Sequence, residues 1–484
     1  MRKLLLATAA IVGASAGAYA AESGFSVAPS QGMAAAPWAS GPAANNNNNA
    51  VGTAVKGNNA VPTPGTVVIR LNGRVETDVG LVFSTSDKSG AFKTSPIGVG
   101  SYMRLYPGVD GLAANGLRYG AAIELRQNFM GGNSLAAGTT AASPSGNSSA
   151  QTVFVRRAFT YMGSDQVGIL RIGTGDGVIG LFDGGVFTTQ TWDSGIGNFN
   201  GGANQSLSPN SSVGVPFVWL SQAGAEYDNA KIVYLTPHFF GVDFGVQYAP
   251  NMGNRFSDSA GGSPYQGAVC TSAGANCIGT TAGNDPTRWY NQVAVGARYQ
   301  GSFSGVDVKG MVVYETAGKE SIGGGGVVAT PGTQGTSAAA FKYDNLSFVT
   351  AAAAVSFSGF TVAADYIGGA VNGQLAMRPN GGAPTNAVVA GITYANGPFI
   401  LGAEVGIVDT QGSAALTKIS QRHETEIAFG GTYKVAPGLA LVGEFMHTER
   451  HQGGFDFVNN TGAVGTPTKD VKSNSVVFAT IVTW

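Results

Sequence analysis

The chain has 484 residues, of which 11% are charged and 74 are glycine, whereas an ordinary globular protein has about 25% charged residues and about 7% glycine. Its formal net charge is −1, so the charge balance does not favour a nucleic-acid-binding protein, which needs a basic surface. Beyond the N-terminus no uninterrupted apolar run reaches about 18 residues, so no membrane-spanning helix is predicted. This composition indicates many strands and turns.

The first 20 residues have the three parts of a secretory signal peptide. Arg2 and Lys3 form the basic region, residues 4–12 form the apolar core, and Ala18-Tyr19-Ala20 fits the cleavage site. We therefore expect residues 1–20 to be removed on export.

Residues 21–65 are rich in Ala and Asn and cannot bury a core. We expect a disordered or loosely attached extension, with binding to the cell wall or to a partner as the alternative. The chain has two cysteines, Cys270 and Cys277. An exported protein reaches an oxidising compartment, so we expect these two to form a local disulfide.

From residue 66 the sequence alternates between apolar and polar side chains, which is the period of a β-strand. In residues 67–83 the apolar side chains share one parity, and the other parity carries Arg70 and Arg74. The run is long enough to cross a membrane as a tilted strand. The same alternation recurs in residues 117–129, 293–299, 399–407, 427–435 and 476–484.

Short and long connections alternate between the expected strands. Short links fall at 107–116, 163–167, 236–241, 301–305, 358–359, 395–398 and 436–438, and long links at 84–98, 130–150, 174–216, 250–286, 316–344, 369–385, 409–422 and 451–471. Seven short and eight long links separate sixteen strands, with both ends of the chain on the short-turn side. A soluble sandwich also alternates, but an export signal, long strands, an even strand number and two classes of connection are together typical of a membrane barrel, whose sheet closes without a free edge. We predict an all-β fold over residues 66–484: a 16-stranded antiparallel transmembrane β-barrel.

Three stretches of the sequence resemble the general trimeric porins of the Gram-negative outer membrane. They are Val155-Arg156-Arg157-Ala158-Phe159-Thr160-Tyr161 with residues 168–173, the hairpin at residues 231–248, and the C-terminal strand, which ends in Trp484 where phenylalanine is usual. The resemblance implies a homotrimer among outer-membrane lipid and lipopolysaccharide, passive diffusion of small solutes, and recognition of the last strand by the barrel-assembly machinery. A diffusion pore makes no covalent chemistry, so we expect no enzyme activity, catalytic residue, cofactor or metal.

The chain is organised around residues 152–202, where two strand-like runs, 152–162 and 168–173, open into a loop rich in Gly and Asn. We expect this loop to fold inward as a constriction loop and narrow the lumen. Its acidic candidates are Asp176, Asp183 and Asp193. The basic candidates of the opposing wall, expected to face the lumen because a charge turned to lipid costs about 2–4 kcal/mol, are Arg70, Arg74, Arg104, Arg118, Arg126 and Arg156. Arg157 has the opposite parity to Arg156; an interface position, a trimer contact and a bulge remain open.

Opposed charges across a narrow lumen create a field that aligns polar solutes. Because the basic wall and the acidic loop partly cancel, the sign of ion selectivity is not predicted. The alternative functions are a channel with a weak lumen site for a sugar or anion, and an outer-membrane enzyme such as a phospholipase.

Two competing motifs are weak. Residues 175–180 fit the G-x-G-x-x-G pattern, but no helix-forming run follows them. His447 and His451 lie four residues apart, a spacing that aligns ligands on a helix, whereas this segment is expected to be a strand that runs into a loop.

Overall fold

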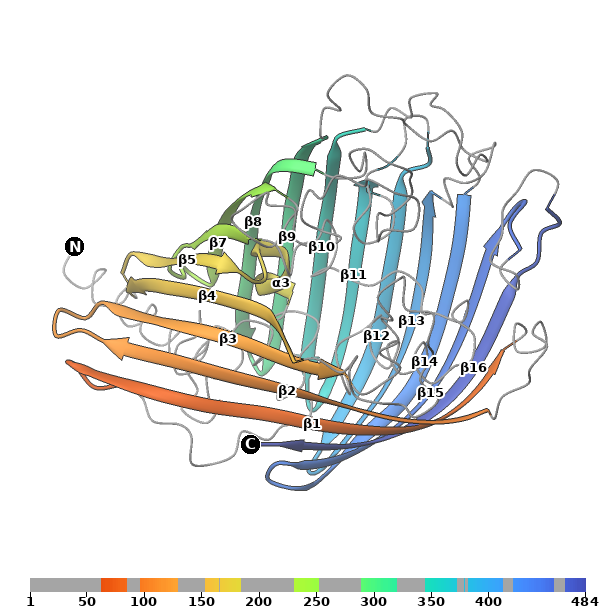
Figure 1. Ribbon diagram of the computed structural model, residues 1–484, viewed down its shortest axis with the longest axis horizontal. Helices are drawn as coiled ribbons and strands as arrows, with labels where there is room; N and C mark the ends of the chain where they lie inside the picture. The colour runs from red at the N-terminus through yellow and green to blue at the C-terminus, as the bar shows by residue number, and fades with distance from the viewer. Residues whose placement is uncertain are drawn as a thin grey trace, which may run out of the picture.

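The computed structural model of the chain describes residues 62–84, 96–128, 153–164, 166–183, 230–251, 289–319, 344–371, 378, 382–411, 421–456 and 466–484. These residues form sixteen strands and the short helix α3, Val178–Asp183, which follows β5 (Figure 1). The first eight strands are β1 (Thr66–Ser84), β2 (Ile97–Leu112), β3 (Arg118–Asn128), β4 (Phe154–Ser164), β5 (Gly168–Thr174), β6 (Ala230–Leu235), β7 (Val242–Asn251) and β8 (Trp289–Phe303). The other eight are β9 (Val306–Lys319), β10 (Leu346–Phe357), β11 (Phe360–Ala370), β12 (Thr385–Asn396), β13 (Phe399–Gln411), β14 (Gln421–Ala436), β15 (Leu439–Gln452) and β16 (Val471–Thr483).

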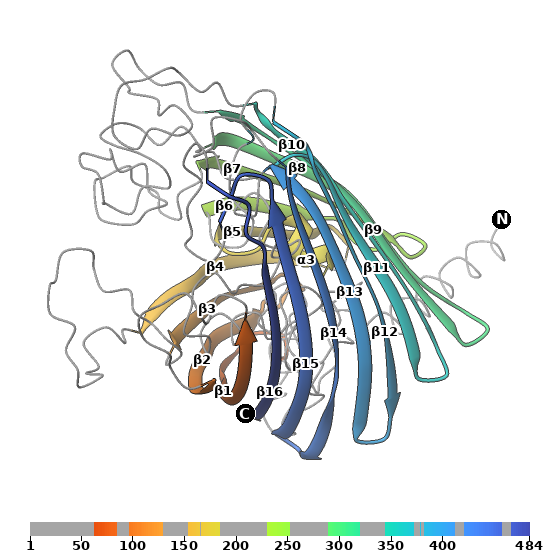
Figure 2. The same ribbon diagram turned by 90° about the vertical axis from the view of Figure 1, so that its right-hand side faces the viewer.

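Each strand pairs antiparallel with its neighbours in the chain, and β1 also pairs with β16, so the sheet closes into a barrel. Figures 1 and 2 show the strands as one tilted wall that runs in chain order. The predicted 16-stranded antiparallel barrel is therefore confirmed. None of the helices in the described residues is long and apolar enough to cross a membrane.

The first short link is narrower than the predicted range 107–116, because β2 continues to Leu112. Proline has no N–H group to donate and is normally kept out of paired strands. Here Pro107 lies opposite Leu71 on β1, whereas the pairing of β2 with β3 omits Tyr106 and Pro107. The strand therefore passes through the proline with one ladder interrupted.

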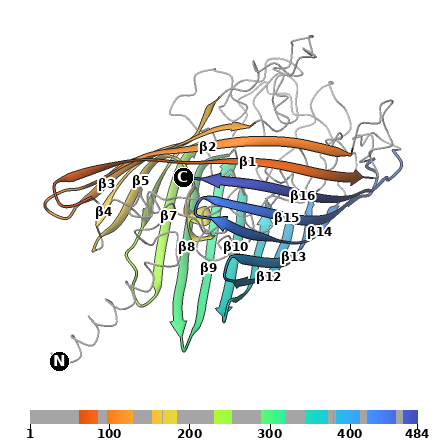
Figure 3. The same ribbon diagram turned by 90° about the horizontal axis from the view of Figure 1, so that it is seen from below.

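The barrel closes where Trp484 meets β1. The backbone N–H of Gly73 donates to Trp484 O at 3.0 Å, and that of Trp484 donates to Gly73 O at 3.1 Å. A Cβ added at Gly73 would overlap the Trp484 ring, so glycine is required for this ring to lie on β1. Figure 3 shows β1 and β16 side by side at this seam.

Side chains alternate between the two faces of the wall along each strand. On β14, Ile427 and Phe429 are each 52% exposed, whereas Glu426 and Ala428 between them are buried. Large apolar side chains are exposed on every strand of the barrel, whereas charged side chains such as Arg74 and Glu426 are buried. The apolar face therefore points outward to lipid and the polar face points into the lumen.

Helix α3 lies inside the barrel, within residues 174–216, which were expected to be a long link with no helix-forming run after residues 175–180. It packs on β7, β8 and β9 (Figure 1). Its side chains Val178, Ile179, Leu181 and Phe182 are all buried. Burial of these four apolar groups explains why so short a segment is helical, since a helix of this length is not stable alone.

Candidate functional site

A β-bulge in β4 decides the orientation of Arg157. Glu124 of β3 pairs with Arg157, but the next residue, Leu125, pairs with Val155, so Arg156 is the extra residue. A bulge shifts the side-chain alternation by one position. Among the three possibilities left open for Arg157, the structure therefore shows the bulge, and the Arg157 side chain turns inward.

Arg157 joins the root of the infolded segment to the wall. Its guanidinium donates to Glu124 on β3. The same guanidinium binds both carboxylate oxygens of Asp176, with NH2–Oδ1 at 2.9 Å and Nε–Oδ2 at 2.7 Å. All three side chains are buried. Two carboxylates thus compensate one buried guanidinium in a bidentate geometry that fixes distance and angle. Asp176 is held at the start of the loop.

Two further hydrogen bonds hold the segment along the wall. Lys231 Nζ on β6 donates to Gly175 O at 2.9 Å, and the backbone N–H of Val178 donates to Gln247 Oε1 on β7 at 2.7 Å. Gln247 Nε2 in turn donates to Gln292 Oε1 on β8 at 3.2 Å, and Gln292 donates to Glu315 on β9. The segment is thus bonded to β6 and β7, and the side chains behind Gln247 continue the network to β9. Residues 175–178 cannot leave the wall without breaking the bonds to Lys231 and Gln247.

The apolar side of α3 rests on the inner face of β7 and β8. A Cβ added at Gly245 would lie 2.8 Å from Val178 Cγ1 and 3.0 Å from Phe182 Cζ, so glycine makes the space for the helix. The Arg298 guanidinium lies 5.0 Å from the centre of the Phe182 ring. Arg298 also binds both oxygens of Asp243, at 3.1 and 2.7 Å. The helix therefore packs against a neutralised, rigid ion pair.

Three of the predicted basic residues occupy one row across neighbouring strands. Arg74 on β1 pairs in register with Arg104 on β2, and Arg104 pairs with Arg126 on β3. Arg74 and Arg104, which pair directly, share the inner face of the sheet. Arg74 is fully buried and forms an ion pair with Glu76, whereas Arg104 is half-buried on the inner face.

The other predicted site residues are placed as follows. Arg118 is half-buried on the inner face at the start of β3. Arg70, Arg156 and Asp183 lie in β1, β4 and α3, but their side chains and that of Arg126 are not among those described. Asp193, Cys270 and Cys277 lie outside the described residues.

A second group of inner-wall charges was not anticipated from the sequence. Glu404 on β13, Glu424 and Glu426 on β14, and Glu444 on β15 are all buried on the inner face. Glu424 lies 3.2 Å from Arg450 Nε and 3.9 Å from Arg422 NH1. The lumen wall thus has a basic row on β1–β3 and an acidic group on β13–β15.

The sequence reading also missed Glu124, Lys231, Gln247 and Arg298 as partners of the loop. No local signal marks the bulge beside Arg157, because the apolar residues Val155, Phe159 and Tyr161 keep one parity along β4. Nothing local marks the other four, because their role depends on which strand lies under the loop.

Comparisons with known proteins identify the family of the chain. The sequence model of the Gram-negative porins matches residues 7–453. No match was found among curated proteins. Similar solved structures include the in-vitro folded, trimeric form of OmpT of Vibrio cholerae, at 11% identity and a TM-score of 0.47, covering 87% of this chain and 100% of that one. They also include the anion-selective porin from Comamonas acidovorans, at 14% identity and a TM-score of 0.47, with the same coverage, and a mutant of the Rh. blastica porin, at 15% identity and a TM-score of 0.43, covering 86% and 100%. The chain belongs to the Gram-negative porins and is a β-barrel protein of the outer membrane.

Proposed function

We propose that the protein is a passive porin whose infolded segment sets the narrowest part of a water-filled lumen for small hydrophilic solutes and ions. The observation that carries this proposal is the course of residues 175–183. They leave the wall after β5 and pack on the inner face of β7, β8 and β9, held by Arg157, Lys231 and Gln247. A segment fixed inside a barrel with a polar inner face narrows the lumen and leaves the rest of it open.

The proposed selectivity arises from the charges of the two sides of the lumen. On the basic side we assign Arg104 and Arg118, which are half-buried, together with Arg70, Arg126 and Arg156; Arg74 is paired with Glu76, so we propose that it adds little to the field. On the loop we assign Asp183 and Asp193. Asp176 belongs to the same loop, but its charge is compensated by Arg157, so we propose that it anchors the loop and adds little to the field.

Reversal potentials in a salt gradient test this assignment. Asp183→Asn and Asp193→Asn each remove one negative charge from the proposed constriction, so the reversal potential should move toward anions. Asp470→Asn removes the same charge near the outer rim and is the matched control. Equal reversal potentials in all three variants and the parent protein would show that Asp183 and Asp193 do not line the constriction.

A solute-specific channel is the rival proposal for the same lumen. Liposome swelling with neutral sugars of increasing size separates the two. A general porin gives rates that fall smoothly with solute size, whereas a channel with a sugar-binding site gives a rate that saturates for one sugar; a conductance that one anion blocks saturably would indicate an anion site. Neither the porin nor the solute-specific channel has a catalytic residue. Hydrolysis of a phospholipid by the purified protein would contradict both proposals.

Assembly and processing complete the proposal. We propose that residues 1–20 are removed on export, that residues 21–65 form an extension outside the barrel, and that Cys270 and Cys277 form a disulfide. We also propose a homotrimer embedded in lipid and lipopolysaccharide, with the strand that ends at Trp484 as the segment recognised by the barrel-assembly machinery. These statements are supported by the sequence features and by the family, and single-channel currents that open in groups of three would test the trimer.

A further inference from the structure

Charged and histidine side chains gather on the outer face of β13–β16, at the end of the strands that leads into the long links. We call this group the rim patch; it consists of Asp409, His423, His447, Glu449, His451, Asp470, Lys472 and Asn474. Three of the four histidines of the chain are in it. His423 is exposed on the same face of β14 as Ile427, while Glu424 and Glu426 face inward. The patch therefore lies outside the lumen.

Within the rim patch, His423 and His451 form a cross-strand pair. They are directly opposite each other in the register of β14 and β15. Their ring centroids are 6.2 Å apart, with 29° between the ring planes. About half of each side chain is exposed. Solvent and solutes therefore reach both rings.

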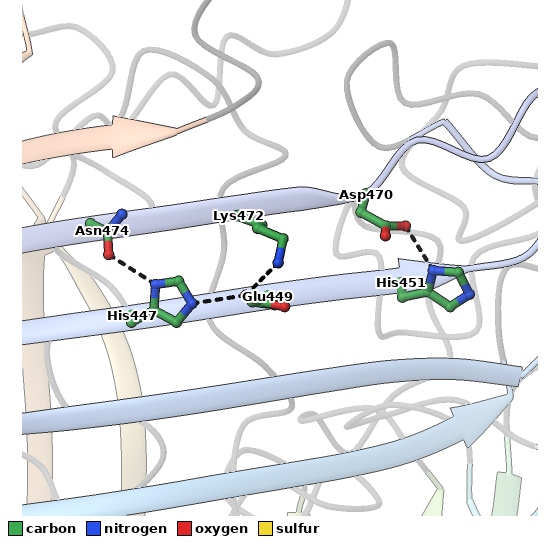
Figure 4. A network of polar contacts seen from close by, with 6 residues as sticks. All are labelled: His447, Glu449, His451, Asp470, Lys472 and Asn474. Atoms are coloured by element: carbon green, nitrogen blue, oxygen red, sulfur yellow. Dashed lines mark hydrogen bonds and ion pairs between the residues drawn. The ribbon is translucent and has the colours of Figure 1, made fainter.

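A carboxylate orients each ring of the pair. Nδ1 of His423 donates to Asp409 Oδ1 on β13. Nδ1 of His451 donates to Asp470 Oδ1 at 2.7 Å, just before β16, as Figure 4 shows. A carboxylate accepts a hydrogen bond, so it fixes the proton on Nδ1 and leaves the lone pair on Nε2 in the neutral ring. Neither Nε2 has a hydrogen-bond partner among the residues that the structure describes.

We infer that His423 and His451 bind a transition-metal ion of the Zn²⁺ or Cu²⁺ class through Nε2. Imidazole is a preferred ligand of these ions, and a metal-binding histidine almost always donates its other N–H to a carboxylate or a carbonyl. With metal–nitrogen bonds of about 2.0–2.1 Å, two imidazoles on one ion have ring centroids roughly 5–6 Å apart. The observed separation of 6.2 Å lies slightly above this range, so a small rotation of the exposed side chains is needed to bring both Nε2 atoms to one ion.

Water would supply the remaining ligands of the ion. In the part of the chain that the structure describes, no group of three or more His, Cys, Asp or Glu side chains is arranged to hold a metal ion. The site is therefore a two-histidine site, with Asp409 and Asp470 behind the ligands as orienting groups. A hard ion such as Mg²⁺ prefers oxygen ligands, so it should not compete.

His447 is a matched control in the same patch. Both of its nitrogens are engaged, Nδ1 with Asn474 Oδ1 at 2.8 Å and Nε2 with Glu449 Oε1 at 3.1 Å. Lys472 Nζ donates to the same carboxylate oxygen of Glu449 at 2.6 Å. Figure 4 shows this network beside the His451–Asp470 contact. His447 therefore offers no open nitrogen to an ion.

Calorimetric titration of the refolded full-length protein in detergent with ZnCl₂, and separately with CuCl₂, tests the inference. We expect saturable binding with one ion per chain that His423→Gln or His451→Gln abolishes. Asp409→Asn and Asp470→Asn should each weaken binding roughly tenfold or more, because they remove the orienting partner of one ligand. His447→Gln should leave the affinity within about twofold. Unchanged channel conductance is the check that each variant folds, since all these positions lie on the outer face.

Three results would overturn the inference. The first is the absence of Zn²⁺ and Cu²⁺ binding by the parent protein. The second is binding that persists in both His423→Gln and His451→Gln, which would place the ion elsewhere in the chain. The third is displacement of Zn²⁺ by an equal concentration of Mg²⁺, which would indicate a carboxylate site with no role for the imidazoles.

Discussion

Replacing Arg157 by methionine removes the cation that ties the infolded segment to β3 and β4. Methionine keeps the long apolar stem but has no group that donates to Glu124 or Asp176. Both carboxylates are buried, at 1% exposure each. Removal of one partner from a buried ion pair usually costs about 3–5 kcal/mol, because the remaining charge loses its compensation in a poorly solvated place. We expect a loss of stability of about that size.

The same substitution should also free the root of the loop. Lys231 and Gln247 still hold Gly175 and Val178, so we expect the segment to shift and not to leave the lumen. Single-channel recordings should show a higher mean conductance and noisier open states. Urea unfolding in lipid vesicles, followed by the fluorescence of the five tryptophans, gives the change in stability.

Two further variants make the Arg157 prediction specific. Arg118→Met removes a positive charge from the same wall, six residues from Glu124 along β3, and should leave the open-state noise unchanged. Adding Asp176→Asn to Arg157→Met should recover part of the lost stability, because an amide needs no cation beside it. If Arg157→Met and Arg118→Met have the same open-state noise and the same unfolding midpoint, then the ion pairs of Arg157 do not hold the loop in place.

Four other predictions test separate parts of the structure. Gly245→Val should displace α3, cost about 1–3 kcal/mol through overpacking and change the conductance. Gly310→Val is its control, because an added Cβ there meets only Ala352 O at 3.6 Å; equal conductance changes in the two variants would contradict the packing of α3 on β7. Gly73→Val should remove the place of the Trp484 ring and slow refolding, measured by the rate at which β structure forms in vesicles; a parental rate would contradict the closure described at the seam. Phe429→Lys on the lipid face should cost about 2–4 kcal/mol, and Val435→Lys, near the turn of the same strand, about 0–1 kcal/mol; equal losses would show that the two positions do not differ in depth. Burial lowers the pKa of His238, which lies in the turn between β6 and β7, so the stability from its neutral form is present above about pH 6.5 and is lost as the pH falls below it. His238→Gln should reduce the loss of unfolding free energy between neutral pH and acidic pH. An unchanged loss would show that other groups cause it.

The number of strands and the class of fold could be predicted from the sequence because their signals are local. Each strand shows its own two-residue period, and the short links contain glycine, proline or asparagine in places such as residues 358–359 and 397–398. These signals do not depend on which strand lies beside which.

The details of the lumen depend on neighbours that the sequence does not identify. The bulge at Arg156 is defined by the mismatch between β3 and β4, and it alone turns Arg157 inward. Helix α3 is stabilised by contact with β7, β8 and β9, far along the chain. His423 and His451 are 28 residues apart and become a pair only through the register of β14 and β15.

Single-channel conductance of the refolded protein in planar bilayers tests most directly that the barrel encloses a water-filled lumen. The structure predicts discrete current steps whose size rises in proportion to the conductivity of the bathing KCl solution. Protein that has inserted into the bilayer with a β-rich spectrum, yet shows no steps at any salt concentration, would contradict an open channel.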